Sequence, residues 1–371
     1  MKKVLFTASI AKHILRFHLP YLKWFKENGF ETHVACNGDE EIPFADYKHK
    51  VNFVRNPFHL GHFSSYHELK KILNDENFDL VHCHTPMASV ITRLASRFHR
   101  PKGLNVLYTA HGFHFFKGGP LIYWLLYYPM EKYLSQFTDA IITINKEDFD
   151  LIQNNGFKNK KTYLINGVGV NNDRFTPKEN NFKLDLRQKC GFQNNDFILV
   201  YVAEFIERKN HTFIINSTNE LKTKIPNLKI LFAGRGILKD QMENLVVKLN
   251  LNDTIKFLGF RDDINDVMRL ADLGISASKQ EGLGLNLIEE MMVGLPIIAT
   301  IDRGHKEVVS HGKNGFLFEQ NNKLMFIEYV IDLYNNPKKY RNFSQEAIVS
   351  SEKFALSKSL IQMENIYNNF I

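Results

Sequence analysis

Cysteine is scarce in this sequence, which has only three, widely spaced, in 371 residues. So few thiols, odd in number, exclude a disulfide framework and favour a reducing compartment. Long apolar runs are also missing, because none approaches the roughly 20 residues that a membrane-spanning helix requires. The first residues, MKKVLFTASIAKH, carry a basic tip, but Ser9, Lys12 and His13 interrupt their apolar run. We therefore expect no signal peptide and a cytoplasmic protein.

Negative charge is also short in the first part of the chain. Residues 1–170 contain 21 Lys and Arg against 15 Asp and Glu, a net charge of +6, whereas residues 171–371 contain 26 against 25, a net charge of +1. Twelve of the fifteen histidines lie in the first part as well. This excess predicts an anionic partner, such as a lipid headgroup, a pyrophosphate or a nucleic acid, although a solvated basic surface explains it equally well.

What the sequence does contain is a regular alternation of β-rich and helical segments. We expect strands at 2–9, 31–36, 51–56, 79–84, 105–111, 139–145 and 162–167, and again at 197–204, 228–234, 254–260, 272–278 and 296–300. Helices are expected at 13–29, 64–77 and 357–371, and a polar loop-like segment at 167–192.

This alternation predicts an α/β protein with two doubly wound parallel-sheet domains that face each other across a cleft. The first domain is expected at residues 1–168, and a C-terminal helix of about 355–371 crosses back to it. The second domain is expected at residues 169–354. Ligands of such sheets bind at the carboxyl ends of the strands, so the cleft is the expected site.

The stretch QEGLGLNLIEEMMVGLPIIAT, residues 280–300, places Glu281 and Glu289 on either side of a glycine-rich turn. Gly282 and Gly284 let the backbone approach a ligand closely. The helix start that follows offers N–H groups to a phosphate, and a carboxylate there accepts hydrogen bonds from a ribose diol. The alternative is a capping box between Asn286 and Glu289, which leaves Glu281 and the glycines unexplained.

Basic residues follow two other strands of the same predicted sheet. Arg208 and Lys209 come after the strand at 197–204, and Gly234-Arg235-Gly236 comes after the strand at 228–234. Several cations at one sheet edge suit a diphosphate, although a solvated surface explains any one of them alone.

Histidines stand out in the first half. His111 follows a strand, and a histidine there can hydrogen-bond a reacting group, with His114 as a competitor for that role. His82 and His84 share one strand face, but zinc requires three or four ligands, so without a third we expect no metal site. Residues 120–134, PLIYWLLYYPMEKYL, predict a core helix or a membrane-interface segment.

Together these stretches resemble the retaining family 4 glycosyltransferases of the GT-B type, the glycosyl transferases group 1, over nearly the whole chain. EGLGLNLIE is similar to the E-x7-E motif of that family, AEFIERKN to GRLxxxKG, FAGRG to its Gly-X-Gly element and FLGFRDDI to LGxRxDI. NGVGVNNDRFTP resembles its interdomain linker, and TAHGF resembles its active-site histidine segment. The stretches TASIAKHILRFHLPYL, HCHTP, TAHGFHFF and DRGHKEVV are most similar to bacterial capsule and exopolysaccharide transferases.

The resemblance implies a role for each matching residue. The implied catalytic residues are His111 near the reacting sugar carbon, Lys209 at the diphosphate and Glu281 at the donor sugar. The implied donor-binding set is Arg208, Lys209, Gly234, Arg235, Arg261, Glu281, Gly282, Leu283, Gly284, Leu285 and Glu289, the last of these at the ribose. Glu204 replaces the arginine of GRL, so it turns away, pairs with Arg208 or Arg235, or contacts the donor sugar, and Arg208 is expected to substitute for that arginine.

The activity implied by the resemblance is that of a retaining, metal-independent hexosyltransferase without a cofactor. It moves a hexose or N-acetylhexosamine from a UDP-sugar to a polyprenyl-pyrophosphate-linked saccharide in capsule or exopolysaccharide synthesis. The protein is then peripheral on the cytoplasmic face of the inner membrane and has no nucleic-acid partner. The alternatives are a UDP-sugar 2-epimerase of the same fold and a non-catalytic nucleotide-sugar-binding assembly subunit. No G-x-G-x-x-G follows the first strand, which argues against an NAD-dependent dehydrogenase.

Overall fold

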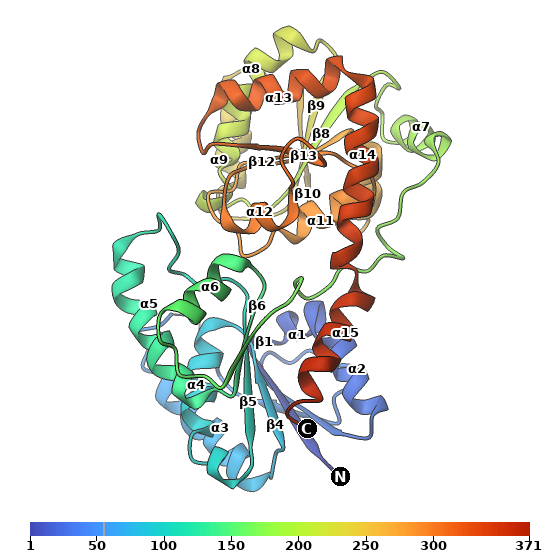
Figure 1. Ribbon diagram of the computed structural model, residues 1–371. Helices are drawn as coiled ribbons and strands as arrows, with labels where there is room; N and C mark the ends of the chain where they lie inside the picture. Colours follow the sequence, from blue (N-terminus) through green and yellow to red (C-terminus); the bar gives the residue numbers. More distant parts are fainter. Residues whose placement is uncertain (55) are drawn as a thin grey trace. The chain divides into compact units, whose positions relative to one another are not determined.

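The computed structural model describes residues 1–54 and 56–371, and these form two compact units. Unit 1 comprises residues 1–169 and 357–371, and unit 2 comprises residues 170–356. Each unit is built around one parallel sheet with helices on its faces, as the alternation predicts (Figure 1).

The sheet of unit 1 has seven strands in the order β3-β2-β1-β4-β5-β6-β7. The strands are β1 (Lys3–Ile10), β2 (Glu31–Asn37), β3 (Tyr47–Lys50), β4 (Leu80–Cys83), β5 (Asn105–Ala110), β6 (Ala140–Thr143) and β7 (Lys161–Leu164). The helices are α1 (Ala11–Phe17), α2 (Leu19–Glu27), α3 (His62–Asp75), α4 (Pro86–Ser96), α5 (Leu121–Leu134), α6 (Lys146–Asn154) and α15 (Leu356–Tyr367), of which α15 begins one residue before the unit boundary.

Both faces of this sheet are buried, because successive side chains of a strand point to opposite sides. Leu5 packs into the cluster that contains Leu69 of α3 and Ile91 of α4. The next residue, Phe6, packs edge to face on Phe25 of α2 at a ring separation of 5.9 Å. The apolar runs of the strands therefore face helices on both sides.

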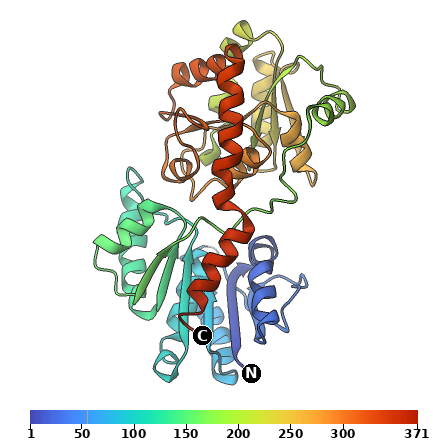
Figure 2. The same cartoon turned by 45° about the vertical axis from the view of Figure 1, so that its right-hand side comes forward.

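The C-terminal helix α15 lies against unit 1 (Figures 1 and 2). The hydroxyl of Tyr367 bonds His82 Nδ1 on β4 at 2.9 Å, and its ring packs on Phe25 at 4.6 Å. At the end of the chain, the side-chain amide of Asn105 donates to the carbonyl of Phe370 at 2.8 Å. The last residues of the sequence thus complete the core formed by the first ones.

The sheet of unit 2 has six strands in the order β10-β9-β8-β11-β12-β13. The strands are β8 (Phe197–Val202), β9 (Leu228–Ala233), β10 (Ile255–Gly259), β11 (Leu273–Ser276), β12 (Ile297–Thr300) and β13 (Gly315–Phe318). The helices are α7 (Asn180–Lys189), α8 (His211–Lys224), α9 (Lys239–Lys248), α10 (Ile264–Leu270), α11 (Leu285–Met292), α12 (Arg303–Val308), α13 (Lys323–Asn335) and α14 (Pro337–Ser351).

In both sheets the strand order reverses beside the first strand, between β1 and β4 in unit 1 and between β8 and β11 in unit 2. The connections on either side of such a reversal run to opposite faces of the sheet, so a crevice opens at the carboxyl ends of these two strands. The topology therefore selects the residues after β1 and β4, and those after β8 and β11, as the expected ligand sites.

Three expectations from the sequence are wrong in detail, and one strand was not expected. The strand expected at 51–56 lies earlier in the chain, as β3 (Tyr47–Lys50). Val51, which follows β3, packs under α3, and position 55 lies outside the described residues. The helix expected at 13–29 is broken at His18, because Pro20 has no N–H for a helical hydrogen bond and is accommodated in the first turn of a new helix. β13 has no expected counterpart.

The third error is the segment 167–192, expected to be a polar loop, which contains α7. The helix is anchored by Arg187, which is only 4% exposed. Its guanidinium donates to Asp272 Oδ2 at 2.6 Å and to the carbonyl of Leu270 at 2.9 Å. A polar helix of this kind depends on tertiary partners that a local pattern does not reveal.

Within the described part of the chain, no helix is both long enough and apolar enough to cross a bilayer.

Candidate functional site

The reversal of unit 2 brings together three of the residues predicted from the sequence. Lys209 closes the single helical turn Glu207–Lys209 after β8, and Glu281 lies in the turn after β11. Lys209 Nζ forms an ion pair with Glu281 Oε1, and Arg208 Nη1 lies 3.1 Å from Glu281 Oε2. Arg208 also donates to the carbonyl of Gln280. The two cations therefore hold one carboxylate between them.

Two of the three side chains are largely withdrawn from solvent, since Lys209 and Glu281 are 13% and 11% exposed, whereas Arg208 is 40% exposed at the rim. Burial by itself raises the pKa of Glu281, but the charges of Lys209 and Arg208 outweigh that effect and lower the pKa to about 2. Glu281 is thus an anion at every physiological pH. Two cations and one anion leave a net charge of +1 in a shielded corner, which attracts a further anion.

Helix α11 begins immediately after this corner. Its N-cap is Gly284, whose φ of +91° lies in the left-handed region that glycine adopts without strain. Because the helix starts at Leu285, Asn286 lies inside it and is not the cap, so the capping-box interpretation is wrong. Glu289, one turn into the helix, is half-buried. The N–H groups of Leu285 and Asn286 precede the first intrahelical bond of α11, which Leu287 donates to the carbonyl of Gly284 at 3.0 Å, and they lie close to Glu281 in the sequence.

The neighbouring residue Glu290 has the opposite environment. It is fully buried and faces the sheet, where a side chain on Gly274 of β11 would collide with its carboxyl. Burial, with a contribution from the charge of Glu289, raises the pKa of Glu290 well above its ordinary value. Of the two adjacent acids, only Glu289 is available as an anion for a ligand.

The Gly-X-Gly element has a steric reason within the unit. A Cβ on Gly234 would lie 2.0 Å from the carbonyl oxygen of Ala203, and a Cβ on Gly236 would lie 2.5 Å from both the backbone N and O of Phe205. The two glycines thus allow the loops after β8 and β9 to lie against each other. Their expected contact with a ligand is not needed to explain them.

Two other predicted cations have partners outside the Lys209 cluster. Arg235 is exposed and stacks over Phe260, with its guanidinium carbon 4.2 Å from the ring centre. Arg261 donates to Asp263 Oδ1 at 2.7 Å within its own loop. Glu204, which replaces the arginine of the GRL motif, is exposed and forms no ion pair with any described residue. The expected pairing of Glu204 with Arg208 or Arg235 is therefore wrong.

The loop after β12 contributes residues that the sequence analysis did not assign to the site. Arg303 Nε lies 3.4 Å from the carbonyl of Glu281, and a Cβ on Gly304 would lie 2.8 Å from the backbone N of Leu283. His305 is buried beside Gly284 and also lowers the pKa of Glu281, after the larger contributions of Lys209 and Arg208. Their position after a predicted strand of the same sheet was the available signal.

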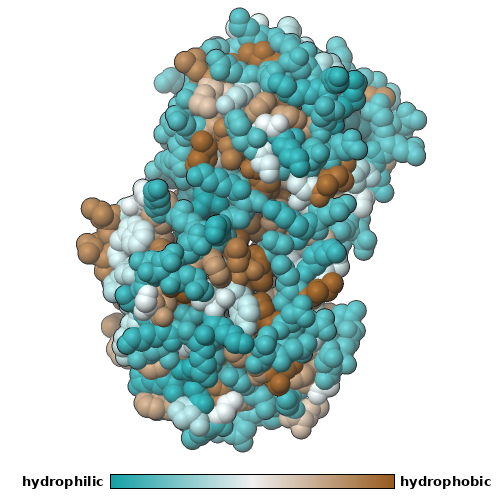
Figure 3. All heavy atoms as spheres, in the orientation of Figure 1, coloured by the Kyte–Doolittle hydropathy of each residue, from teal (hydrophilic) through white to brown (hydrophobic). Residues whose placement is uncertain are grey.

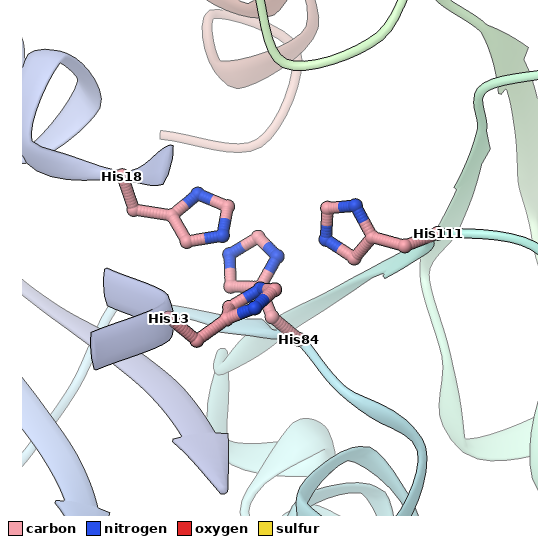
Figure 4. A group of neighbouring side chains, drawn as sticks. All are labelled: His13, His18, His84 and His111. Carbon is pink, nitrogen blue, oxygen red and sulfur yellow. The ribbon is translucent and has the colours of Figure 1, made fainter. Parts of the chain in front are cut away.

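In unit 1 the reversal gathers histidines. His84 follows β4, His111 follows β5, and α1 with its junction to α2 supplies His13 and His18 (Figure 4). One ring nitrogen of each lies within 4.8 Å of the others. The argument that no third ligand lies near His84 is therefore wrong, because three loops that are distant in sequence meet at one sheet edge. His114 is exposed and stacks on Tyr127 at 4.8 Å.

Next to these histidines unit 1 has a cavity of about 490 Å³. One part of its lining is polar and basic, with Ser9, Lys12, His13 and Arg16, and the other is apolar, with Phe17, Pro57, Met87 and Tyr127. Such a lining suits a ligand with an anionic end and an apolar end.

Both units match models of glycosyltransferase families. Residues 21–171 match Glycosyltransferase Family 4, and residues 182–349 match Glycosyl transferases group 1. The chain is 42% identical over 370 residues to EpsD of Bacillus subtilis, which is named as a glycosyltransferase. The alignment covers 100% of this chain and 97% of EpsD. It is 26% identical to the UDP-Gal:alpha-D-GlcNAc-diphosphoundecaprenol alpha-1,3-galactosyltransferase of Escherichia coli, over 86% of this chain and 84% of that enzyme.

Among solved structures, Anabaena HepE in complex with UDP superposes with a TM-score of 0.80 at 19% identity, over 100% of both chains. HepE has also been solved with UDP and glucose and superposes equally well, with a TM-score of 0.80. The shared architecture is the GT-B fold of two Rossmann-like units. The chain belongs to the GT-B glycosyltransferases of family 4, the glycosyl transferases group 1.

Proposed function

We propose that the protein transfers a hexose or N-acetylhexosamine from a UDP-sugar to a saccharide on polyprenyl pyrophosphate, in exopolysaccharide synthesis. The observation that carries the proposal is the shielded corner of Lys209, Arg208 and Glu281 at the sheet reversal of unit 2, directly before the start of α11. The name of EpsD supports glycosyl transfer, the name of the E. coli galactosyltransferase supports the same donor and acceptor classes, and the UDP bound to HepE supports the same nucleotide.

In this proposal unit 2 binds the donor. Lys209 and Arg208 bind the diphosphate, together with first-turn amides of α11, because all three supply donors to phosphate oxygens. Glu289 accepts hydrogen bonds from the ribose hydroxyls, and Glu281 orients the donor sugar. Glu281 has a second task that follows from its ion pairs, namely to hold both cations in place before the diphosphate arrives.

Unit 1 binds the acceptor. The basic part of its cavity, with Lys12 and Arg16, suits the pyrophosphate, and the apolar part, with Phe17 and Met87, suits the first prenyl groups. His111 hydrogen-bonds the donor sugar during transfer. The reaction breaks the bond from the anomeric carbon to UDP and forms one to the acceptor hydroxyl on the same face, and the leaving diphosphate takes the hydroxyl proton. Lys209 and Arg208 neutralise the leaving group, so no metal is required for this step.

A lipid-linked acceptor requires the protein to reach the cytoplasmic face of the membrane, and α5 provides a surface for this. Its side chains Leu121, Ile122, Leu125 and Leu126 are between 42% and 80% exposed. Figure 3 shows apolar residues gathered at this edge of unit 1. An exposed apolar helix beside a basic cavity suits the interface of an anionic bilayer.

The decisive test is a donor screen with the full-length protein and membrane-extracted polyprenyl-pyrophosphate saccharides, read by mass spectrometry. Lys209→Ala should lower kcat/KM about 100-fold or more, because it removes charge from the leaving diphosphate. Lys222→Ala, an exposed lysine of α8, is the matched control and should keep wild-type turnover. Conversion of a UDP-sugar without acceptor would instead identify an epimerase, and UDP binding without any turnover would identify an assembly subunit.

A further inference from the structure

Four imidazoles converge at the sheet reversal of unit 1, and the proposed transfer uses only one of them, His111. The ring nitrogens that His13, His18, His84 and His111 offer lie within 4.8 Å of one another (Figure 4). The rings of His18 and His84 are stacked at 3.7 Å, and those of His13 and His111 are 5.1 Å apart. Imidazole nitrogen is a common ligand of zinc, which binds three or four protein ligands.

The hydrogen bonds of the cluster are incomplete within the described chain. Both ring nitrogens of His18 and of His84 are buried without a hydrogen-bond partner, and so is Nε2 of His111. Their neighbour His82 shows the contrast, because its Nδ1 bonds the Tyr367 hydroxyl at 2.9 Å and its Nε2 bonds Thr109 Oγ1 at 2.8 Å. Buried polar atoms are normally paired, so these nitrogens indicate an unassigned partner.

We propose that this cluster is a binding site for a zinc-class divalent cation, and that the bound cation inhibits glycosyl transfer by engaging His111. All four donors are imidazole nitrogens and no carboxylate belongs to the group. Imidazole ligands suit Zn²⁺, Cu²⁺ and Ni²⁺, whereas Mg²⁺ and Ca²⁺ prefer oxygen. The inhibitory part rests on the proposed function, which gives His111 to the donor sugar.

The spacing of the ring nitrogens is close to that of a tetrahedral site. Tetrahedral Zn²⁺ with bonds of 2.0–2.1 Å places its ligand nitrogens about 3.4 Å apart. The nitrogens here lie within 4.8 Å of one another, at most about 1.4 Å wider than this, and the stacked rings of His18 and His84 must turn to face one centre. Their backbones are already fixed, because the N–H of His18 donates to Ile14 O and that of His84 to Thr7 O, each at 2.8 Å.

A cation can reach the cluster. His18 and His84 are buried, but His13 and His111 are half-buried, and His13 also lines the 490 Å³ cavity. Burial and the neighbouring imidazoles keep the pKa values of His18, His84 and His111 well below the ordinary value. The rings are therefore neutral, the form that ligates a metal.

A second group with metal-ligand composition, Glu31, His33 and Glu76, has a different explanation. Lys3 lies 2.9 Å from Glu31 and 2.5 Å from Glu76, and His33 bonds Glu31 at 2.8 Å. Both of its carboxylates already pair with Lys3, and Glu31 also bonds His33, so the contacts within the group account for its composition.

The test is calorimetric titration of chelator-treated full-length protein with ZnCl₂, and with MgCl₂ in parallel. We expect one Zn²⁺ per chain and no heat of binding for Mg²⁺. His84→Ala should weaken Zn²⁺ binding about tenfold or more, since even outer-shell changes cost this much. His67→Ala, an exposed histidine of α3, is the matched control and should bind as the wild type does. Equal affinity in His84→Ala would overturn the site.

X-ray absorption at the zinc edge of the wild-type protein keeps the proposal testable if His84→Ala does not fold. A first shell of three or four imidazoles supports the site, and a shell of mostly oxygen overturns it. In the transfer assay one equivalent of Zn²⁺ should abolish turnover and a chelator should restore it. Zinc bound by imidazoles with full turnover would refute the inhibition alone. Absence of turnover with every donor would refute the proposed function, while the titration would still decide the metal site.

Discussion

Replacing Glu281 with glutamine tests whether its ion pairs with Lys209 and Arg208 stabilise unit 2. The substitution keeps the shape of the side chain but removes the charge that Lys209 and Arg208 share. A carboxyl whose pKa falls from 4.5 to about 2 on folding contributes about 3 kcal/mol to stability at neutral pH. We expect Glu281→Gln to lose this amount, which agrees with the roughly 3–5 kcal/mol reported for breaking a buried pair.

The loss should depend on pH with a defined sign. Because the folded pKa lies below the unfolded one, the stabilisation is complete above about 4.5 and disappears as pH falls towards about 2. The wild type and Glu281→Gln should therefore differ most near neutral pH and converge in acid. For a unit of this size, about 3 kcal/mol corresponds to a fall in Tm of roughly 6 to 12 °C.

The assay has an internal reference. Both tryptophans, Trp24 and Trp124, lie in unit 1, so their fluorescence follows that unit. Hydrogen exchange of peptides from β8 and β11 follows unit 2 and should show the loss, while the tryptophan signal stays near its wild-type transition. Glu243→Gln is the matched control, because Glu243 is 38% exposed and its pair with Lys239 on the surface of α9 should change stability by less than about 0.5 kcal/mol when broken. A loss of less than about 1 kcal/mol for Glu281→Gln would refute the reasoning.

Three further predictions concern residues outside the ion-paired corner. Glu290→Gln should gain stability relative to the wild type as pH rises above about 4.5, because the raised pKa means that the folded wild type must retain a proton; urea unfolding at several pH values measures this. Gly234→Ala should lower the free energy of unfolding by more than about 2 kcal/mol, because its Cβ would lie 2.0 Å from a carbonyl oxygen. Gly29→Ala, which has open space but a positive φ, should lower it by about 1 kcal/mol, and thermal unfolding measures both. Leu125→Glu should reduce cosedimentation with anionic vesicles severalfold at unchanged Tm, and Ile361→Glu, another exposed apolar residue of unit 1, should leave it unchanged.

Local patterns in the sequence predicted the class of fold and the donor corner. A Gly-rich or basic turn that follows an apolar strand lies at the carboxyl end of that strand. In a parallel sheet the carboxyl ends of all strands lie along the same edge, so such turns are neighbours. Lys209 and Glu281 were predicted as parts of one site for this reason, and they form an ion pair. Their roles in donor binding remain predictions.

Tertiary structure decided what the patterns left open. Adjacent acids are equivalent in sequence, but only packing against Gly274 shows that Glu290 belongs to the core and Glu289 does not. Likewise, a histidine in isolation says nothing about its neighbours, and His13, His84 and His111 come together only because the sheet of unit 1 reverses between β1 and β4. Where a strand was predicted correctly, the sequence alone identified the side chains that follow it, since this depends on local periodicity. Which of them meet depended on strand order, which is set by long-range packing.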